Sequence, residues 1–210
     1  GWVFNRNSSG VIVPNGTRSA PIWISIPHSA LSGETHGLIK HGHGMFGDGR
    51  DVVDLGWTRP CGTHPPRECG WYHGRMGDTH KFITFASDLV GMTAEDRDEY
   101  ALTLIIDLSR FTWIADRLHQ GMLEYLLVTR AMKTQFGTMP EIMERGIRVD
   151  DSELYYWGIS QGAIFGPTFM ALSPDITRGA LGVAGNNYAM LMERSQNFSP
   201  FFAVLSSAYP

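Results

Sequence analysis

The spacing of apolar residues along the chain changes between the two-residue period of strands and the three-to-four-residue period of helices, and each change predicts a new strand or helix. Residues 21–27, PIWISIP, have an isoleucine at every second position between two prolines, which is typical of a strand. Residues 35–47 begin with a second short apolar run, which leads into glycines. Residues 81–92, KFITFASDLVGM, are rich in β-branched and aromatic side chains and predict a third strand that ends near Asp88.

From Thr93 to about Lys133, apolar residues recur at spacings of three and four, which predicts one or two amphipathic helices. Thr93 and Asp96 have the spacing of a capping box, with Asp in place of the usual Glu. Residues 154–159 form a continuous apolar run, as in a strand buried on both faces. We expect a helix to begin at Gln161 and a further strand to lie within residues 178–185.

Strands that alternate with helices predict an α/β domain with a mostly parallel central sheet and helices on both faces. The 210 residues suit a single domain of this kind. Residues 48–80 interrupt the pattern, because they hold few aliphatic side chains and many Gly, His, Pro and Trp residues. We expect them to form a long irregular excursion over one edge of the sheet, with Trp57, Trp71 and Tyr72 beside the active-site mouth.

Composition narrows the range of partners. Hydrophobic residues make up 43% of the chain and charged residues 18%, which is enough apolar material for a packed core. The net charge is −4 and no run of Lys and Arg forms a basic stripe, so we expect no nucleic-acid partner. Every apolar run is far shorter than the roughly 20 residues of a membrane-spanning helix, so no transmembrane segment is expected.

A serine stands between two glycines where the buried strand meets the next helix, in Gly158-Ile159-Ser160-Gln161-Gly162. A turn of this kind is so tight that the serine has strained backbone angles and stands exposed, while the glycines avoid clashes. The helix that follows directs its free N–H groups at developing negative charge. A plain glycine-rich turn is the alternative, but the strand before and the helix after favour a nucleophile at Ser160.

Two glycine-containing segments precede this motif: HGHGMFG at residues 41–47 and SDLVGMT at residues 87–93. In this order the three motifs resemble the α/β-hydrolase superfamily, in particular bacterial lipases and esterases. In that superfamily an H-G-x-x-G loop follows the third strand and a D-x-R-G-x-G segment follows the fourth. Val90 replaces the arginine of the second pattern. The resemblance spans residues 21–185, most of the chain.

The resemblance implies roles for named residues. Ser160 would be the catalytic nucleophile, and the backbone N–H groups of Met45 and Gln161 would form the oxyanion hole. His43 would be a structural residue of the loop that hydrogen-bonds the backbone. The glycines that allow close backbone approach would be Gly44, Gly158 and Gly162. No cofactor and no metal are implied.

Two registers of the loop are open, because His41-Gly42 fits the His-Gly pair as well as His43-Gly44 does. The second register is preferred, since Met45-Phe46-Gly47 then matches the HGMxG form found in many lipases.

The superfamily order is serine, then acid, then histidine, and the chain departs from it. No histidine follows Ser160, and only two carboxylates do, Asp175 and Glu193. The last histidine is His119, on a predicted helix. We therefore expect an incomplete α/β-hydrolase domain that lacks its C-terminal strands, with the acid and the histidine supplied by a second chain or by a further C-terminal segment.

Cys61 and Cys69 are the two cysteines, and their close spacing with two intervening prolines suits a local disulfide. Two free thiols are one alternative. A zinc site formed by Cys61, His64, Cys69 and His73 is another, although its spacing matches no common zinc finger. A disulfide would imply an oxidising compartment, so a secreted or periplasmic location is expected.

The sequence thus favours a serine hydrolase that cleaves small-molecule or lipid carboxylic esters through an acyl-enzyme at Ser160. A hydrolase-like binding or scaffold protein that lacks its triad is the first alternative. A small metal-binding protein organised by residues 61–73 is the second.

Overall fold

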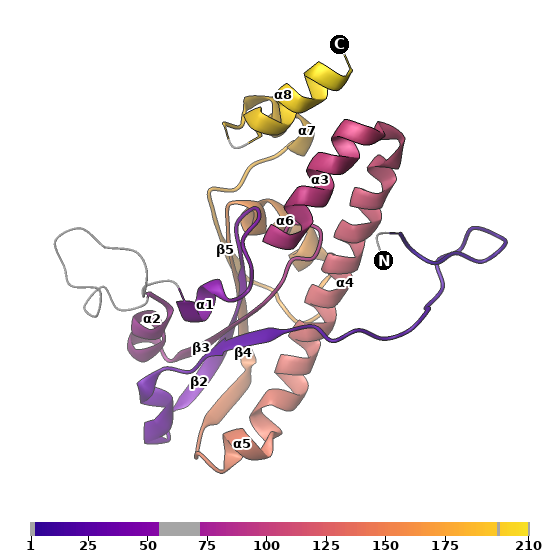
Figure 1. Ribbon diagram of the computed structural model, residues 1–210. Coiled ribbons are helices and arrows are strands. Elements are labelled where there is room, and N and C mark those ends of the chain that lie inside the picture. Colours follow the sequence, from indigo (N-terminus) through magenta and orange to yellow (C-terminus); the bar gives the residue numbers. More distant parts are fainter. Residues whose placement is uncertain (1–2, 55–71, 197, 210) are drawn as a thin grey trace.

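The computed structural model describes residues 3–54, 72–196 and 198–209 of the chain (Figure 1). Five strands form one sheet: β1 (Ile22–Ser25), β2 (Thr35–Gly42), β3 (Phe82–Ser87), β4 (Arg148–Ile159) and β5 (Gly179–Gly182). The helices are α1 (Asp51–Asp54), α2 (Tyr72–His80), α3 (Ala94–Ile106), α4 (Phe111–Gln135), α5 (Pro140–Met143), α6 (Gln161–Leu172), α7 (Tyr188–Arg194) and α8 (Ser199–Ala208).

The strand order in the sheet is β1-β3-β2-β4-β5. β2 pairs in parallel with both β3 and β4, and β5 pairs in parallel with β4, while β1 runs antiparallel to β3 at one edge. The register sets Gly42 opposite Gly158, so that β2 and β4 end side by side. The expected α/β architecture with a mostly parallel sheet is therefore confirmed.

The sheet has helices on two sides, with α4 and α6 on one and α1 and α2 on the other (Figure 1). Side chains alternate along a strand, so Leu38 and Lys40 of β2 face α4, whereas Ile39 and His41 face α2. The core beside α4 and α6 contains Leu38, Phe85, Tyr125, Leu154, Tyr156 and Phe169. Apolar contacts on this side hold α6 against the sheet and so determine where the junction between β4 and α6 lies.

The strands expected from the pattern are all present, and Thr93 and Asp96 begin α3 with a capping box. The periodic stretch from Thr93 is split into two helices by a break at residues 107–110. The expectation that residues 48–80 are irregular throughout was wrong at its two ends, because residues 51–54 and 72–80 are helical. Residues 55–71, which hold Trp57, Trp71, Cys61 and Cys69, lie outside the described residues, so the expected disulfide does too.

Two short helices at the end of the chain have no counterpart in the sequence-based expectations. Both α7 and α8 lie at the same end of the sheet as α3, and α8 packs on α3 (Figure 1). Phe202 of α8 and Met190 of α7 are about half exposed. The spacing argument missed these helices because each is too short to show several turns of periodicity.

Candidate functional site

Ser160 lies between the last residue of β4 and the first residue of α6, with φ 51° and ψ −118°. A positive φ is uncommon for a residue with a side chain and costs on the order of 1–3 kcal/mol. The Ser160 amide donates a 2.9 Å hydrogen bond to the carbonyl oxygen of Gly182 on β5, which holds the turn against the next strand. The strained conformation expected at this junction is therefore observed.

Three glycines allow the turn at residues 158–162, here called the elbow, to pack backbone against backbone. A Cβ atom added to Gly158 would lie 2.5 Å from the Gly162 oxygen, and one added to Gly162 would lie 2.3 Å from the Gly42 oxygen. At Gly42 an added Cβ would meet the Tyr156 hydroxyl oxygen at 2.0 Å. That hydroxyl donates a 2.7 Å hydrogen bond to the Gly162 carbonyl, so Tyr156 joins β4 to the first turn of α6.

The loop after β2 is joined directly to the elbow. The Gly162 amide donates a 2.9 Å hydrogen bond to the His43 carbonyl oxygen. A Cβ atom on Gly44 would lie 3.7 Å from the Ser160 Cβ, so Gly44 passes beside the serine. The structure thus brings together the two motifs that are about 115 residues apart in the sequence.

His43 is fully buried and both of its ring nitrogens contact backbone groups. Nε2 accepts a 2.8 Å hydrogen bond from the Leu89 amide, which requires the proton on Nδ1, and Nδ1 donates to the Gly44 oxygen at 2.7 Å. Burial lowers the pKa of His43, and the Gly44 oxygen acts in the opposite direction. His43 therefore joins the loop after β2 to the loop after β3 as a neutral imidazole.

The oxyanion donors expected from the sequence are the amides of Met45 and Gln161. The Met45 amide has no hydrogen-bond acceptor among the described residues, whereas its neighbour Phe46 donates to the Met92 oxygen at 2.8 Å. Gln161 is the first residue of α6, so its N–H has no acceptor within the helix. Its side chain is buried, and Oε1 accepts a 3.3 Å hydrogen bond from the Tyr188 hydroxyl.

An aromatic cluster lies beside this loop. The ring centroid of Phe46 is 6.0 Å from that of Tyr100 on α3 and 5.6 Å from that of Phe201 on α8. Phe46 has φ 56°, so the backbone that carries this ring is itself strained. The Tyr100 hydroxyl donates to the Gly91 oxygen. Helices α3 and α8 are therefore coupled to the loop that holds Met45.

The segment after β3 is organised around Asp96. Its Oδ2 accepts hydrogen bonds from the amides of Gly91 and Thr93, at 2.7 Å and 2.9 Å, and Oδ1 lies 2.9 Å from the Arg117 Nε. Burial raises the pKa of Asp96, but the hydrogen bonds from Thr93 and Arg117 outweigh it and leave the pKa below its ordinary value. Arg117, from α4, provides a positive charge in this segment.

No described residue completes a triad at Ser160. The Ser160 Oγ has no hydrogen-bond partner within the described parts of the chain. Asp175 precedes β5, at the opposite end of the strand, and its carboxylate contacts Arg130 at 2.8 Å and Lys133 at 3.8 Å. Glu193 is on α7 and is exposed. His119 is exposed on α4 and stacks on Phe4.

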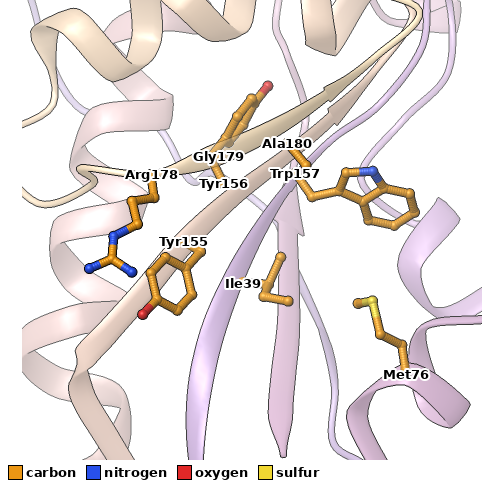
Figure 2. Close-up of a pocket in the computed structure, with 8 residues that line it drawn as sticks. All are labelled: Ile39, Met76, Tyr155, Tyr156, Trp157, Arg178, Gly179 and Ala180. Carbon is orange, nitrogen blue, oxygen red and sulfur yellow. The ribbon is translucent and has the colours of Figure 1, made fainter. Parts of the chain in front are cut away.

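An open cavity of about 360 Å³ lies elsewhere, on the face of the sheet that carries α2 (Figure 2). Its lining residues are Ile39, Met76, Tyr155, Tyr156, Trp157, Arg178, Gly179 and Ala180. The nearest of these in sequence to Ser160 is Trp157, whose side chain lies on the far face of β4 from Tyr156 (Figure 2). None of residues 158–162 lines the cavity.

Sequence reasoning missed Lys40, whose side chain is completely buried beneath the site. Its Nζ donates a 2.6 Å hydrogen bond to the Ser87 hydroxyl and lies 3.9 Å from the ring centroid of Tyr125. Burial lowers the pKa of Lys40 well below its ordinary value, and the nearby Asp88 carboxylate opposes this. Its signal in the sequence was a lysine directly after the apolar Leu38 and Ile39.

Of the four zinc ligands that the sequence suggests, Cys61, His64, Cys69 and His73, only His73 lies among the described residues. In the described ranges no group of three or more His, Cys, Asp or Glu side chains is arranged to hold a metal ion. Among the helices that the structure describes, none combines the length and apolar character needed to cross a bilayer.

Comparison with protein-family models and with curated proteins finds no match to this chain.

Proposed function

We propose that this chain carries the nucleophile and oxyanion loop of an α/β-hydrolase-type serine hydrolase that cleaves carboxylic esters. The observation that supports it most is the backbone of Ser160, whose φ of 51° occurs at a strand–helix junction between two close-packed glycines. Strain of this kind persists where the surroundings enforce it, and it turns a hydroxyl out of the chain toward a ligand.

The arrangement of the loops also supports the proposal. In the superfamily the H-G loop and the D-x-R-G-x-G segment follow neighbouring strands, and here the corresponding strands β2 and β3 are paired. The hydrogen bond from the Leu89 amide to His43 joins the two loops, and the one from Gly162 to the His43 oxygen joins them to the elbow.

In the proposed reaction the Ser160 Oγ attacks the ester carbonyl carbon, and the carbonyl oxygen becomes an oxyanion. The N–H groups of Met45 and Gln161 would donate to that oxyanion, at the positive end of α6. Collapse of the intermediate expels the alcohol and leaves an acyl-enzyme on Ser160, which water then hydrolyses. The base that takes the Ser160 proton is proposed to lie outside these 210 residues, on a further segment or a second chain.

Chemical rescue tests this assignment directly. Without its histidine, the chain should hydrolyse an activated ester only at the residual rate that binding and the oxyanion hole provide, about 10³–10⁴ over water. Added imidazole should raise the Ser160-dependent rate by supplying the absent base. The measurement is nitrophenyl-ester hydrolysis with and without imidazole, compared with Ser160→Ala, so that direct catalysis by imidazole is subtracted.

Ser173→Ala is the matched control, because Ser173 ends the same helix with an ordinary φ of −78°. It should react like the unmodified chain, and in the presence of imidazole a fluorophosphonate probe should label Ser160 alone. Equal hydrolysis by Ser160→Ala with no labelling would reject the nucleophile and favour a binding or scaffold protein. Fast turnover without imidazole would reject the external base, and loss of that turnover in His119→Ala would identify His119 instead.

A further inference from the structure

Val183, the residue directly after β5, is both strained and exposed. Its φ is 60°, in the left-handed region that β-branched residues rarely adopt. Its side chain is 80% exposed, more than any other large hydrophobic residue in the parts of the chain that the structure describes. Strain of this kind persists only where the surroundings enforce it, and it is concentrated at catalytic and ligand-binding sites.

The register of the sheet sets Val183 beside Ser160. β4 and β5 are parallel, and their last paired residues are Ile159 and Gly182. The next positions along the two strands are Ser160 and Val183. The Ser160 amide donates its 2.9 Å hydrogen bond to the Gly182 oxygen, as it does when the parallel pattern continues by one more residue. Because adjacent strands lie about 4.8 Å apart, Val183 is the lateral neighbour of the proposed nucleophile.

Strained residues gather at this edge of the sheet. Four non-glycine residues in the described ranges have a positive φ, and three of them follow neighbouring parallel strands: Phe46 after β2, Ser160 after β4 and Val183 after β5. The fourth, Lys81, precedes β3 and so lies at the opposite end of the sheet. Ligands of parallel α/β sheets bind outside the carboxyl ends of the strands, which is the edge where these three residues lie.

The two sides of Ser160 differ in the space that they offer a substrate. On the β2 side lies Gly44, where an added Cβ would have the Ser160 Cβ, at 3.7 Å, as its one neighbour within 4 Å. This side carries the proposed oxyanion donor Met45. On the β5 side lies the branched side chain of Val183. Since the three bonds of a carbonyl carbon point apart, an ester oxygen directed at the Met45 amide places another substituent of that carbon beside Val183.

We propose that Val183 is a specificity-determining residue, which contacts the carbon substituent of the ester on the β5 side of Ser160 and selects against branching there. The inference rests on the proposed hydrolase function and narrows its substrates to esters that are unbranched at this position. The group in question is the acyl chain or the alcohol, which share this apolar chemistry. A β-branched side chain has few rotamers, so additional methyl groups on the substrate meet a wall that cannot turn aside.

Two pairs of activated esters measure this selectivity in the presence of imidazole, with each rate corrected for Ser160→Ala. The acyl pair is nitrophenyl butyrate against nitrophenyl trimethylacetate. The alcohol pair is nitrophenyl acetate against its analogue methylated at both positions next to the ester oxygen. Val183→Ala should raise the branched-to-unbranched rate ratio of one pair by about tenfold, and Val183→Phe should lower it. The pair whose ratio changes identifies the group that lies beside Val183.

Val11→Ala is the matched control, because Val11 is a second exposed valine, at 58%, but lies before β1 and has no positive φ. Its two ratios should equal those of the unmodified chain. Val183→Gly, which also removes the strain, replaces the phenylalanine variant if that variant does not fold, and it should raise the ratio at least as much as Val183→Ala. A loss of folded protein lowers both rates of a pair and leaves their ratio unchanged, so the ratio separates specificity from stability.

Two results would overturn the inference, and they differ from each other. If hydrolysis depends on Ser160 but neither ratio differs between the Val183 variants and Val11→Ala, Val183 does not contact the substrate and the proposed function stands. If no hydrolysis depends on Ser160, the proposed function fails and the role of Val183 fails with it.

Discussion

The Gly162 amide donates a 2.9 Å hydrogen bond to the carbonyl oxygen of His43. This bond joins the first turn of α6 to the loop after β2, and it requires the two backbones to approach more closely than a side chain would allow. The position of the loop relative to Ser160 is thus set by main-chain contact, which has few ways to relax.

Gly162→Ala should disrupt this contact, because the new Cβ would lie 2.3 Å from the Gly42 oxygen. Overpacking of this kind typically costs about 1–3 kcal/mol, and here the obstacle is backbone. Gly182→Ala is the control, since its Cβ would meet nothing closer than 3.6 Å. Urea unfolding should show a clear loss for the first variant and less than about 1 kcal/mol for the second. Equal stabilities would mean that the approach at Gly162 is not close.

Ser160→Gly should stabilise the fold relative to Ser160→Ala. Both variants remove the hydroxyl, but only glycine adopts a φ of 51° without strain from a Cβ atom. The expected difference in the free energy of unfolding is about 1 kcal/mol in favour of glycine, the lower end of the strain for such backbones. Denaturant titration of the two variants measures it. A glycine variant that is no more stable than the alanine variant would show that the turn is unstrained.

Much of the fold could be predicted from spacing alone, because periodicity is a local property. The strand at residues 154–159 and the helix from Gln161 correspond to β4 and α6, and the capping box at Thr93 correctly marked the start of α3. The glycine pattern around Ser160 also predicted its strained backbone. These features are set by residues within a few positions of each other.

The features that spacing could not predict depend on contacts between distant residues. Lys40 packs under Tyr125, 85 positions later in the chain, and His41 meets His73 only because α2 folds back over the sheet. The helix at residues 72–80 was missed because its glycines and histidines carry a weak helical pattern, which packing on β3 and the 3₁₀ turn at His28–Ser32 overrides.

Lys40→Met should alter how stability depends on pH. Burial lowers the pKa of Lys40 in the folded chain, while the unfolded chain keeps a lysine pKa of about 10.4. Between these two values the unfolded state binds more protons, so the contribution of Lys40 to the free energy of unfolding rises with pH. The unmodified chain should therefore gain stability relative to Lys40→Met as the pH rises toward about 10.

The measurement is urea unfolding of both proteins across that range. Lys81→Met removes a lysine that is 41% exposed and is the control for the loss of a charge. A stability difference between the unmodified chain and Lys40→Met that stays constant with pH would contradict the buried position of the amine.

Phe201→Ala should loosen α8 from the loop that holds Phe46. The Phe201 ring lies 5.6 Å from Phe46 and 5.8 Å from Phe198, and aromatic contacts of this kind contribute about 0.5–1.5 kcal/mol each beyond the area that they bury. Hydrogen exchange should become faster in α8 and at the Phe46 amide. Phe202→Ala is the control, because that ring is 48% exposed. Unchanged exchange at Phe46 in the Phe201 variant would show that α8 is not coupled to the loop.

The pairing of β2 with β4 also has a consequence for how the chain is made. Gly42 and Gly158 are neighbours in the sheet, yet more than 100 residues separate them in the sequence. During synthesis β2 can pair with β3 long before β4 leaves the ribosome, so the inner edge of β2 is open to other chains throughout that interval. Closing so long a loop is slow, and the strained turn at Ser160 can form only after it. Conditions that slow the release of the chain from the ribosome should therefore increase aggregation through the unpaired edge of β2, before the turn at Ser160 has formed.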